Sequence, residues 1–575
     1  MLIRRNALAV TIIVLLIAST LVATDFTKLT KANPYIRPEE APSGYRIYTN
    51  GTCTAGNIRR EGEVYTLTGD IEGTIVIERD GIVLDGAGYT LQGKNSSYGI
   101  WLQDKSGVTI KNLNIRNFGY GIRVSHYVAN WRAGETNPNH TTNCTIEACN
   151  ITNNGYGISF YFSFHCRVIG NYIANNTFGV YLYGSGNIFR NNRIEQNKYN
   201  FWDIKEEIND VDASNTINGK PVYYWVNQYN MTVPDNAGLV ILKNCGGIRV
   251  QNLNLTGNGL GVSLYHTIDS EIIGNNITDN YWRGIAVWWS CNNSIIGNQI
   301  TNSEYYGIEV YDSHNNTISH NLIKNNNDDG IYHRTAPRNE VIYSNQIVAN
   351  GGFGIFGGSY NCLIADNFIY GNSGTGLTSG SNSTVTGNNI TQNGKTGVDL
   401  GGNMKFEGNY ISKNDIGVIL FGEYVEIISN AFVDNSQWAI KCGPAANNTI
   451  FNNNFIGNNN NKDQIFFYKN PYWLFANSWD NGIVGNYWSD YNPESQSSGN
   501  KSVYFINNLN QDNHPLLAPL EFATLELPSI QPPQETNPTP PPSNETETIT
   551  LVIACLASVV TVSNGLLVYF RKRKR

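Results

Sequence analysis

A small residue, usually Gly, followed by a β-branched or aliphatic residue recurs along most of the chain. From Gly261 onward, successive pairs lie 23, 23, 23, 24, 22, 21, 20 and 22 residues apart. A fixed period in this range is typical of a solenoid in which each repeat forms one coil. The pairs begin at Gly99, Gly121, Gly157, Gly179, Gly261, Gly284, Gly307, Gly330, Gly354, Gly376, Gly397, Gly417 and Ala439.

A column of Asn residues keeps the same period, each two residues before an Ile or a Phe. Its members are Asn275, Asn298, Asn321, Asn345, Asn367, Asn388, Asn409, Asn430 and Asn453. Asn side chains at the same turn of successive coils bond to the copies above and below. Leucine-rich repeats share the period, but their dense Leu pattern is absent. We therefore predict an all-β chain, a right-handed parallel β-helix solenoid of about 13 recognisable coils.

Breaks in the pattern divide the chain. Within residues 201–245 the period is lost, and Asn218-Gly219 followed by aromatic residues indicates a hairpin that projects from the rod. The predicted segments are a signal peptide (1–23), a linker (24–43), an N-terminal cap (44–98), coils (99–200), the insert (201–245), further coils (246–461), a C-terminal cap (462–520), a Pro-rich stalk (521–548), a transmembrane helix (549–570) and a basic tail (571–575).

The two ends of the chain indicate its location. Arg4 and Arg5 precede an uncharged apolar run, which is the pattern of a secretory signal peptide; an uncleaved anchor is the alternative. Residues 549–570 carry no charge and span about 33 Å as a helix, enough to cross a bilayer. The basic tail that follows should stay cytoplasmic. We expect a single-pass protein of the cell membrane whose β-helix domain is extracellular.

Composition and charge exclude several classes of protein and of binding partner. The chain holds 83 Asn and 56 Gly among 575 residues, while 15% are charged and 12% are aromatic. It is too apolar for a disordered chain and too poor in helix-favouring charged residues for a helical bundle. The net charge is −7, and it becomes −14 without the seven cations near the two ends. A nucleic-acid partner is excluded, because binding that backbone needs a basic surface.

Within each repeated strand, the residues one and three positions after the aliphatic anchor should face outward. Aromatic rings exposed in register suit the flat faces of sugars, which favours polysaccharide binding. The alternative is that these rings only stabilise the sheet, or that a loop covers them. The third-position column reads Tyr161, Tyr183, Tyr265, Trp288, Tyr311 and Arg334; the first-position column includes Trp101, Arg123, Tyr181, Glu309, Tyr332, Phe356, Asp399 and Lys441.

Charge concentrates at one place on this predicted face. Asp328 and Asp329 come directly before the Gly330 anchor, and His333 and Arg334 follow it, while Glu309 and Asp312 lie one coil earlier. Neighbouring carboxylates with His could cleave a glycosidic bond by acid–base chemistry, or could hold Ca²⁺. Asp-Asp-Gly is also an ordinary turn sequence, and the alternation of side chains along a strand could point His333 inward.

Other metal and thiol signals are weak. The eight His are scattered and there are three Met, with neither CxxC nor His-x-His, so copper or zinc ligation has little support. Cys144 and Cys166 are one coil apart, which places them on adjacent rungs. A disulfide and a column of stacked thiols are both compatible with that spacing.

Three segments resemble a known family: "YTLTGDIEGTIVIERDGIVLDGAGYTLQG" near the start, "NTINGKPVYYWVNQ" in the insert, and "GNYWSDY" with Asp512-Asn513-His514-Pro515-Leu516 near the end. They are similar to the NosD-type parallel β-helix, or CASH (carbohydrate-binding and sugar-hydrolase) domain, of the pectin-lyase-like fold. The resemblance covers roughly residues 44–520. The sequence departs from it after Tyr491, where "NPESQSSGNKSVYF" replaces a Gly/Asp-rich loop, so no cation is expected there.

The resemblance implies the fold and a surface location more firmly than an activity. The family is named for a periplasmic protein linked to copper-site maturation, which adds a copper-maturation accessory to the alternatives. Our leading hypothesis is an anchored β-helix that binds polysaccharide along its aromatic face without catalysis. The alternatives are a polysaccharide hydrolase or lyase that uses Asp328 and Asp329, and a structural or adhesive envelope protein.

Overall fold

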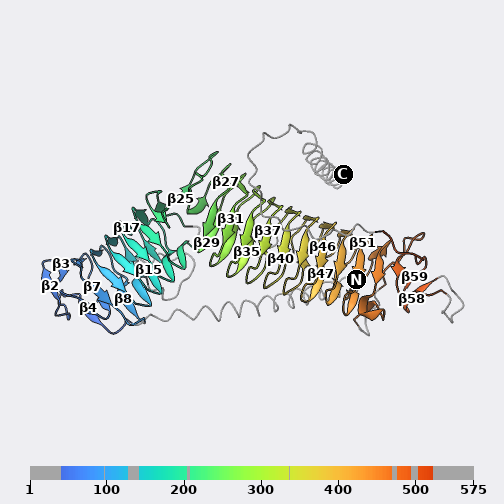
Figure 1. The fold of residues 1–575 in the computed structure, drawn as a ribbon, viewed down its shortest axis with the longest axis horizontal. Coiled ribbons are helices and arrows are strands. Elements are labelled where there is room, and N and C mark those ends of the chain that lie inside the picture. The colour runs from blue at the N-terminus through green and yellow to red at the C-terminus, as the bar shows by residue number, and fades with distance from the viewer. Residues whose placement is uncertain are drawn as a thin grey trace, which may run out of the picture. The chain divides into compact units, whose positions relative to one another are not determined.

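The computed structural model describes residues 41–95, 97–126, 141–203, 207–335, 337–468, 476–493 and 503–521. These residues form a parallel β-solenoid, which confirms the predicted fold class (Figure 1). The only helix among them is a short 3₁₀ turn, η1 (Asn458–Asn460). The predicted signal peptide and transmembrane segment lie outside the described residues. No helix within the described ranges combines the length and the apolar character that crossing a membrane requires.

The solenoid has about 18 turns, more than the 13 coils that the Gly-aliphatic pairs predict. Each turn contributes three strands, of which one is longer than the other two in most turns. The longer strands of the first half form sheet 1: β1 (Tyr45–Ile47), β5 (Ile75–Ile77), β8 (Tyr98–Gln103), β11 (Tyr120–Ser125), β15 (Tyr156–Tyr161), β19 (Phe178–Tyr183) and β22 (Tyr199–Asp203). Its short strands run from β2 (Ile58–Glu61) to β23 (Asp210–Val211) and from β4 (Ile71–Glu72) to β24 (Thr216–Ile217).

The second half repeats this arrangement, with parallel pairing between successive strands of each of its three sheets. Its longer strands form sheet 2: β25 (Lys220–Val226), β26 (Leu239–Lys243), β29 (Leu260–Tyr265), β32 (Arg283–Trp288), β35 (Tyr306–Tyr311), β38 (Ile331–His333), β41 (Ile355–Phe356), β44 (Leu377–Thr378), β47 (Thr396–Leu400), β50 (Ile416–Leu420), β53 (Trp438–Cys442) and β56 (Ile465–Phe467). Sheet 3 comprises β27 (Arg249–Gln251), β30 (Glu271–Ile273), β33 (Ser294–Ile296), β36 (Thr317–Ser319), β39 (Val341–Tyr343), β42 (Leu363–Ala365), β45 (Thr384–Thr386), β48 (Lys405–Glu407), β51 (Glu426–Ile428) and β54 (Thr449–Phe451). Sheet 4 runs from β28 (Asn254–Thr256) to β57 (Tyr487–Trp488).

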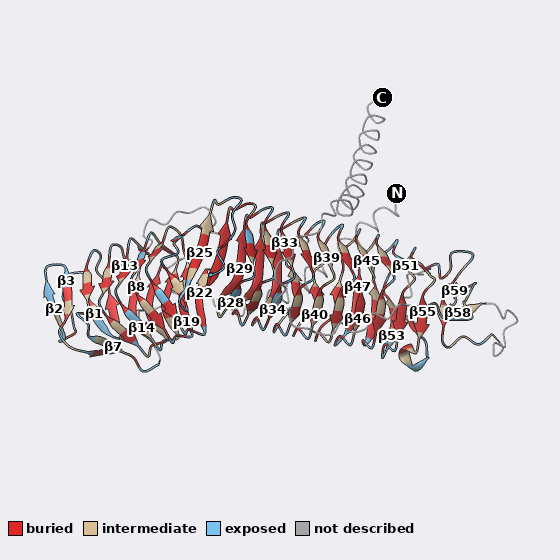
Figure 2. Ribbon diagram, turned by 45° about the horizontal axis from the view of Figure 1, so that its top comes forward, coloured by how far each residue is buried: buried red, intermediate tan, exposed pale blue. Residues whose placement is uncertain are grey.

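The core is a stack of aliphatic side chains, because the middle residue of each short strand points inward. Ile277, Ile300 and Ile323 of sheet 4 occupy the same register in successive coils and are completely buried. The anchor residues of sheet 2, such as Ile285 and Ile308, face them from the opposite wall. Burial accordingly follows the strands in stripes along the rod (Figure 2).

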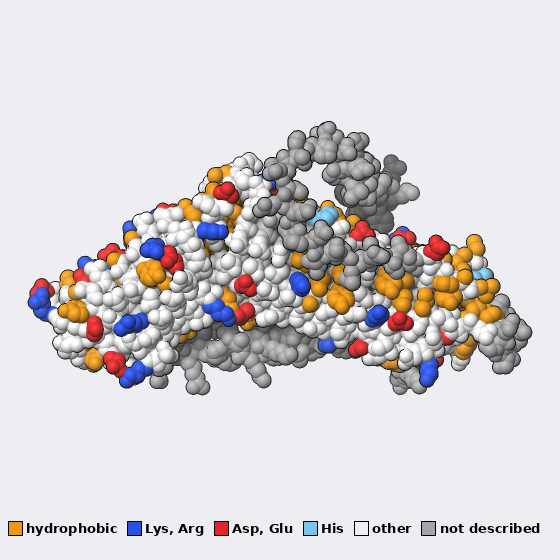
Figure 3. Space-filling model, viewed as in Figure 1, with side chains coloured by type: hydrophobic (Ala, Val, Ile, Leu, Met, Phe, Trp, Pro, Cys, Tyr) orange, Lys and Arg blue, Asp and Glu red, His pale blue; other side chains and the backbone are white. Residues whose placement is uncertain are grey.

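The predicted Asn column is confirmed as a buried ladder of hydrogen bonds. In each step, the backbone N–H and the amide of one Asn donate to the side-chain oxygen of the next; for Asn298 and Asn321 these distances are 2.8 and 3.0 Å. The same amide also donates to the carbonyl of Ile272 at 2.7 Å. Many further Asn residues adopt positive φ at exposed turns, where Asn is well tolerated. Much of the visible surface is therefore uncharged, with scattered ionic side chains (Figure 3).

The insert forms the predicted turn, but its strands belong to the wall of the rod. β24 and β25 pair antiparallel around Asn218-Gly219, and β25 then pairs in parallel with β26. Alternate residues of β26 face two different cores: Leu239 and Ile241 pack in the first, Val240 and Leu242 in the second. A strand buried on both faces reads as a continuous apolar run, which explains this part of the sequence.

A buried ion pair lies at the same junction. Lys243 and Asp203 are each about 1% exposed at their side chains, and Lys243 Nζ lies 2.8 Å from Asp203 Oδ2. The ammonium also donates to the carbonyl of Glu207 at 2.7 Å and sits 5.1 and 4.8 Å from the rings of Tyr224 and Tyr265. The charge is thus held by several partners where the last coil of the first half meets the second half.

Cys144 and Cys166 are stacked thiols in the structure, on adjacent rungs of the first half. Both are buried, and a hydrogen bond between them together with burial raises the pKa of Cys166. All eight cysteines of the described residues are free thiols.

Candidate functional site

The outer face of sheet 2 presents three residues per coil. They lie two positions before the aliphatic anchor, directly after it, and three positions after it. In β32 these are Arg283, Ala286 and Trp288, around the anchor Ile285. Parallel pairing puts each set in register with the next, so side chains form columns along the rod.

Three predicted contact residues lie inside a closed cluster on this face. Tyr265 and Glu309 are fully buried and Trp288 is 6% exposed. The rings of Tyr265 and Trp288 meet edge to face at 4.8 Å, and Trp288 Nε1 donates to Glu309 Oε2 at 2.5 Å. Arg283 Nη2 donates to the other oxygen of Glu309 at 2.9 Å, and the guanidinium lies 3.2 Å from the Trp282 ring centroid. These side chains pack against one another, as the structural alternative expects.

Arg283 and Trp282 were missed by the sequence analysis. Arg283 stands two residues before its anchor, a position outside both predicted columns. Burial lowers its pKa, while Glu309 opposes that shift. The pairing of a buried guanidinium with a buried carboxylate explains why Glu309 sits among aromatic rings.

The solvent-facing aromatics lie at the edge of this cluster, where sheet 2 turns toward sheet 3. We call His266, Trp289, Tyr311 and Arg334 the corner strip. The rings of His266 and Trp289 stack at 5.4 Å, Trp289 meets Tyr311 at 4.9 Å, and the Arg334 guanidinium lies 4.9 Å from the Tyr311 centroid. His266 and Arg334 are exposed, and Trp289 and Tyr311 are half-buried.

The backbone explains why the strip reaches solvent. His266 and Trp289 follow the last residues of β29 and β32 with φ of 48° and 49°. This left-handed conformation ends the strand and turns the next side chain outward. For an aromatic residue it costs about 1–2 kcal/mol relative to a right-handed conformation.

The same corner of the first half carries a smaller aromatic group. Tyr161 and Tyr183 lie 5.3 Å apart, and Phe162, with φ of 52°, packs 4.3 Å from Tyr183. The Arg123 guanidinium lies 4.9 Å from the Tyr161 ring. Tyr161 and Tyr183 are half-buried, so these two predicted residues retain an exposed edge.

The first-position column is mixed in character. Tyr332 is half-buried and stacks between Tyr306 and Phe356 at 4.2 and 5.6 Å. Asp399 lies in register between Thr378 and Ile419, and burial raises its pKa to about 6. Of the remaining members, Trp101 and Arg123 are buried, and Tyr181, Phe356 and Lys441 are half-buried.

The predicted acid–base group is divided by the wall of the coil. Asp329 is 5% exposed on the outer side, where its Oδ1 accepts a hydrogen bond from the backbone N–H of Phe353 at 2.6 Å. Asp328 is half-buried beside it. His333 points inward and is buried, which lowers its pKa to about 4. The structure therefore places His333 and the two carboxylates on opposite sides of the same wall.

Comparison with protein families places the chain among β-helices. A family described as "Right handed beta helix region" matches residues 75–236 and 217–369, which together exceed half of the chain. A family described as "Periplasmic copper-binding protein (NosD)" matches residues 354–493. A search of curated proteins found no match.

Solved structures with similar folds include the periplasmic alginate epimerase AlgG, at 14% identity, 60% of this chain, 76% of that chain and a TM-score of 0.21. The Agl-KA catalytic domain matches at 12% identity, 66% of this chain, 62% of that chain and a TM-score of 0.29. The Siphovirus 9NA tailspike receptor binding domain matches at 8% identity, 74% of this chain, 71% of that chain and a TM-score of 0.26. At these scores the likeness carries no argument about activity.

Proposed function

The chain belongs to the right-handed β-helix family, as a NosD-type member, and we propose that it binds polysaccharide along the corner strip on the outside of this fold. The observation that carries the proposal is the strip itself. Trp289 is held in a left-handed conformation at a cost, yet its ring remains half-buried rather than fully packed. Backbone strain of this kind clusters at ligand-binding positions.

The geometry of the strip suits a glycan that lies along the rod. His266 and Trp289 stack at 5.4 Å, close to the separation of about 4.8 Å between adjacent strands, so the strip offers about one ring per coil. The outward edges of these rings can contact the apolar C–H groups of sugars, and Arg334 at the end of the strip can donate hydrogen bonds to hydroxyl or carboxylate oxygens. This arrangement supports binding without requiring catalysis.

Cleavage by Asp328 and Asp329 has less support. The carboxylate of Asp329 already accepts a backbone hydrogen bond from the next coil, and His333 cannot reach a ligand from inside the wall. Copper binding has no matching donor set: within the described ranges, no three His, Cys, Asp or Glu side chains come together as ligands. We therefore propose a binding protein, displayed outside the cell by the apolar segment 549–570.

The test uses the full-length protein in detergent and affinity electrophoresis through gels that contain different bacterial polysaccharides. We expect a His266→Ala/Trp289→Ala variant to bind about tenfold more weakly, which corresponds to about 1.4 kcal/mol. Phe505→Ala is the matched control, because Phe505 is an exposed aromatic residue (59%) in β58 (Tyr504–Asn507) of the C-terminal cap. Unchanged binding by a correctly folded double variant would remove the corner strip from consideration.

A further inference from the structure

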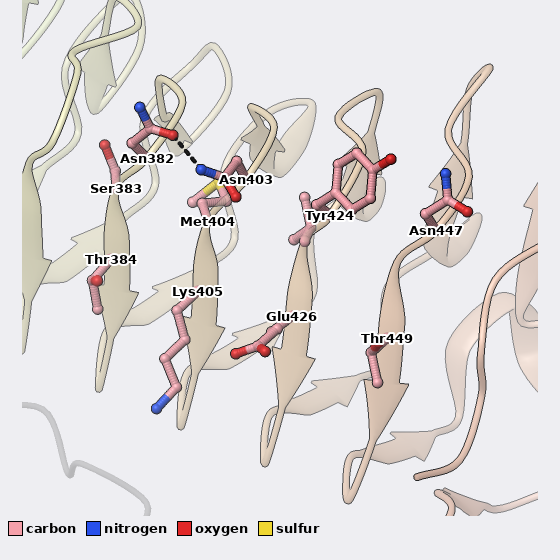
Figure 4. Close-up of a pocket in the computed structure, with 11 residues that line it drawn as sticks. Asn382, Ser383, Thr384, Asn403, Met404, Lys405, Tyr424, Glu426, Asn447 and Thr449 are labelled. Carbon is pink, nitrogen blue, oxygen red and sulfur yellow. Dashed lines mark hydrogen bonds between the residues drawn. The ribbon is translucent and has the colours of Figure 1, made fainter. Parts of the chain in front are cut away.

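A hollow of about 440 Å³ lies on the outer face of sheet 3, away from the corner strip (Figure 4). Its floor crosses β45, β48, β51 and β54 in one register, with Thr384, Lys405, Glu426 and Thr449 side by side. We call this hollow the sheet-3 groove.

One edge of the groove is a column of left-handed turn residues that precede the strands of sheet 3. Seven coils place Asn at this position, with φ between 52° and 62°: Asn292, Asn315, Asn339, Asn361, Asn382, Asn403 and Asn447. Asp269 and Gly247 hold it in the two coils before these, and the one aromatic exception is Tyr424, with φ of 58°. Asn adopts this conformation readily, whereas Tyr pays the steric cost of its Cβ.

Packing does not explain the exception. The Tyr424 side chain is 62% exposed, and within the described part of the chain it makes neither a ring contact nor a hydrogen bond. Figure 4 shows its ring standing at the rim between Asn403 and Asn447. A strained and exposed aromatic ring beside a hollow indicates a ligand that uses the ring face.

The groove also holds hydrogen-bonding groups that the fold does not use. Among the described residues, the Glu426 carboxylate and the Asn447 amide have no side-chain hydrogen bond. The Lys405 ammonium lies 2.5 Å from Glu407, and Asn403 donates to Asn382 at 2.5 Å. Donors and acceptors thus surround one aromatic ring in a space that admits a small ligand.

We propose that the sheet-3 groove binds a neutral sugar, with one sugar ring stacked on Tyr424 and its hydroxyls bonded to Glu426, Asn447 and Lys405. The charge balance disfavours an acidic sugar, because the single cation Lys405 stands beside two carboxylates, Glu407 and Glu426. An acidic sugar would meet repulsion from Glu426. This groove lies on a different sheet from the corner strip, so it is a second site.

The experiment measures binding of malto-, cello-, manno- and chitotetraose to the full-length protein by isothermal titration calorimetry and saturation-transfer NMR. We expect one of these neutral tetrasaccharides to bind and tetragalacturonate not to bind. Tyr424→Asn installs the residue that the neighbouring coils carry, so thermal stability should hold or rise while affinity falls at least tenfold. The matched control is Tyr360→Asn, at another exposed Tyr (44%) directly before Asn361 of the same column.

The proposal is overturned if no neutral tetrasaccharide binds at millimolar concentration, if Tyr424→Asn binds like the wild type, or if Tyr360→Asn loses as much affinity. The His266→Ala/Trp289→Ala variant separates the two proposals. It should lose polysaccharide binding at the corner strip and keep tetrasaccharide binding at the sheet-3 groove.

Discussion

Glu340 offers a sharp test of how the buried ladders control stability. It is fully buried at the start of a sheet-3 strand, one coil after Asn316 in a column of turn residues. Its Oε1 accepts hydrogen bonds from the backbone N–H and the amide of Asn316 at 3.2 and 3.1 Å, while Oε2 has no partner among the described residues. Burial raises the pKa of Glu340 to about 8.

The direction in which pH changes the stability follows from how Glu340 titrates in the folded and unfolded states. The unfolded carboxyl titrates near pH 4.3, so below that pH both states are protonated and burial is not penalised by charge. Between pH 4.3 and 8 the unfolded state loses its proton first, and stability falls as pH rises. At pH 7 the accumulated loss is about 4 kcal/mol. Glu340→Gln keeps the acceptor oxygen and removes the titration, so the variant should become increasingly more stable than the wild type from pH 5 to 8.

Cys362 provides a local readout, because its sulfur accepts a hydrogen bond from the Glu340 backbone N–H at 3.3 Å. Alkylation of Cys362, followed by mass spectrometry, reports opening of this coil. At pH 7 the Glu340→Gln protein should be labelled roughly several hundredfold more slowly than the wild type, and at pH 5 the two rates should differ much less. Glu426→Gln, at an exposed carboxylate, is the control. A ratio that does not change with pH would refute the reasoning.

Two further substitutions test the ladder and the junction. Asn367→Ala removes the oxygen that accepts hydrogen bonds from the backbone N–H and the side-chain amide of Asn345, both at 3.0 Å. It should lower the free energy of unfolding in urea by about 2–4 kcal/mol. The control Asn361→Ala, at an exposed turn, should lower it far less. Lys243→Met leaves the Asp203 carboxylate buried without its cation and should lower the free energy of unfolding by about 3–5 kcal/mol. A second change, Asp203→Leu, should restore most of this stability, as measured by thermal unfolding. A double variant as unstable as Lys243→Met alone would contradict this account.

The fold was predictable because its rules are local and repeat. Inward aliphatic residues and stacked Asn recur with each coil, so the period alone identifies a β-helix. The coils without a Gly-aliphatic pair in the common register escaped notice: those of β1, β5, β22, β25, β26 and β56. In β26 the reason is physical. A strand between two cores needs apolar residues on both faces, so the pattern of alternation disappears there.

The candidate site was predicted only in part. The alternation of side chains along a strand correctly predicts that Tyr265 and Trp288 point away from the coil interior. It does not predict which side chains pack on the outer face. Trp282 and Arg283 close over that position from outside the predicted columns. The sequence does contain a signal for the corner strip. The doublets Tyr265-His266 and Trp288-Trp289 lie one coil apart, and the second residue of each doublet comes directly after the strand ends.

The two proposed sites share one structural cause. Among the Phe, Tyr and Trp residues that the structure describes, only Phe162, Trp289 and Tyr424 adopt positive φ. Each stands at a corner where a sheet ends or begins, where a left-handed turn directs the side chain toward the edge of the sheet. Elsewhere these turns hold mostly Asn, Asp or Gly, which accept the conformation cheaply. Because Asn, Asp or Gly would hold the same backbone at lower cost, binding at the corners is the simplest reason for an aromatic residue at such a turn.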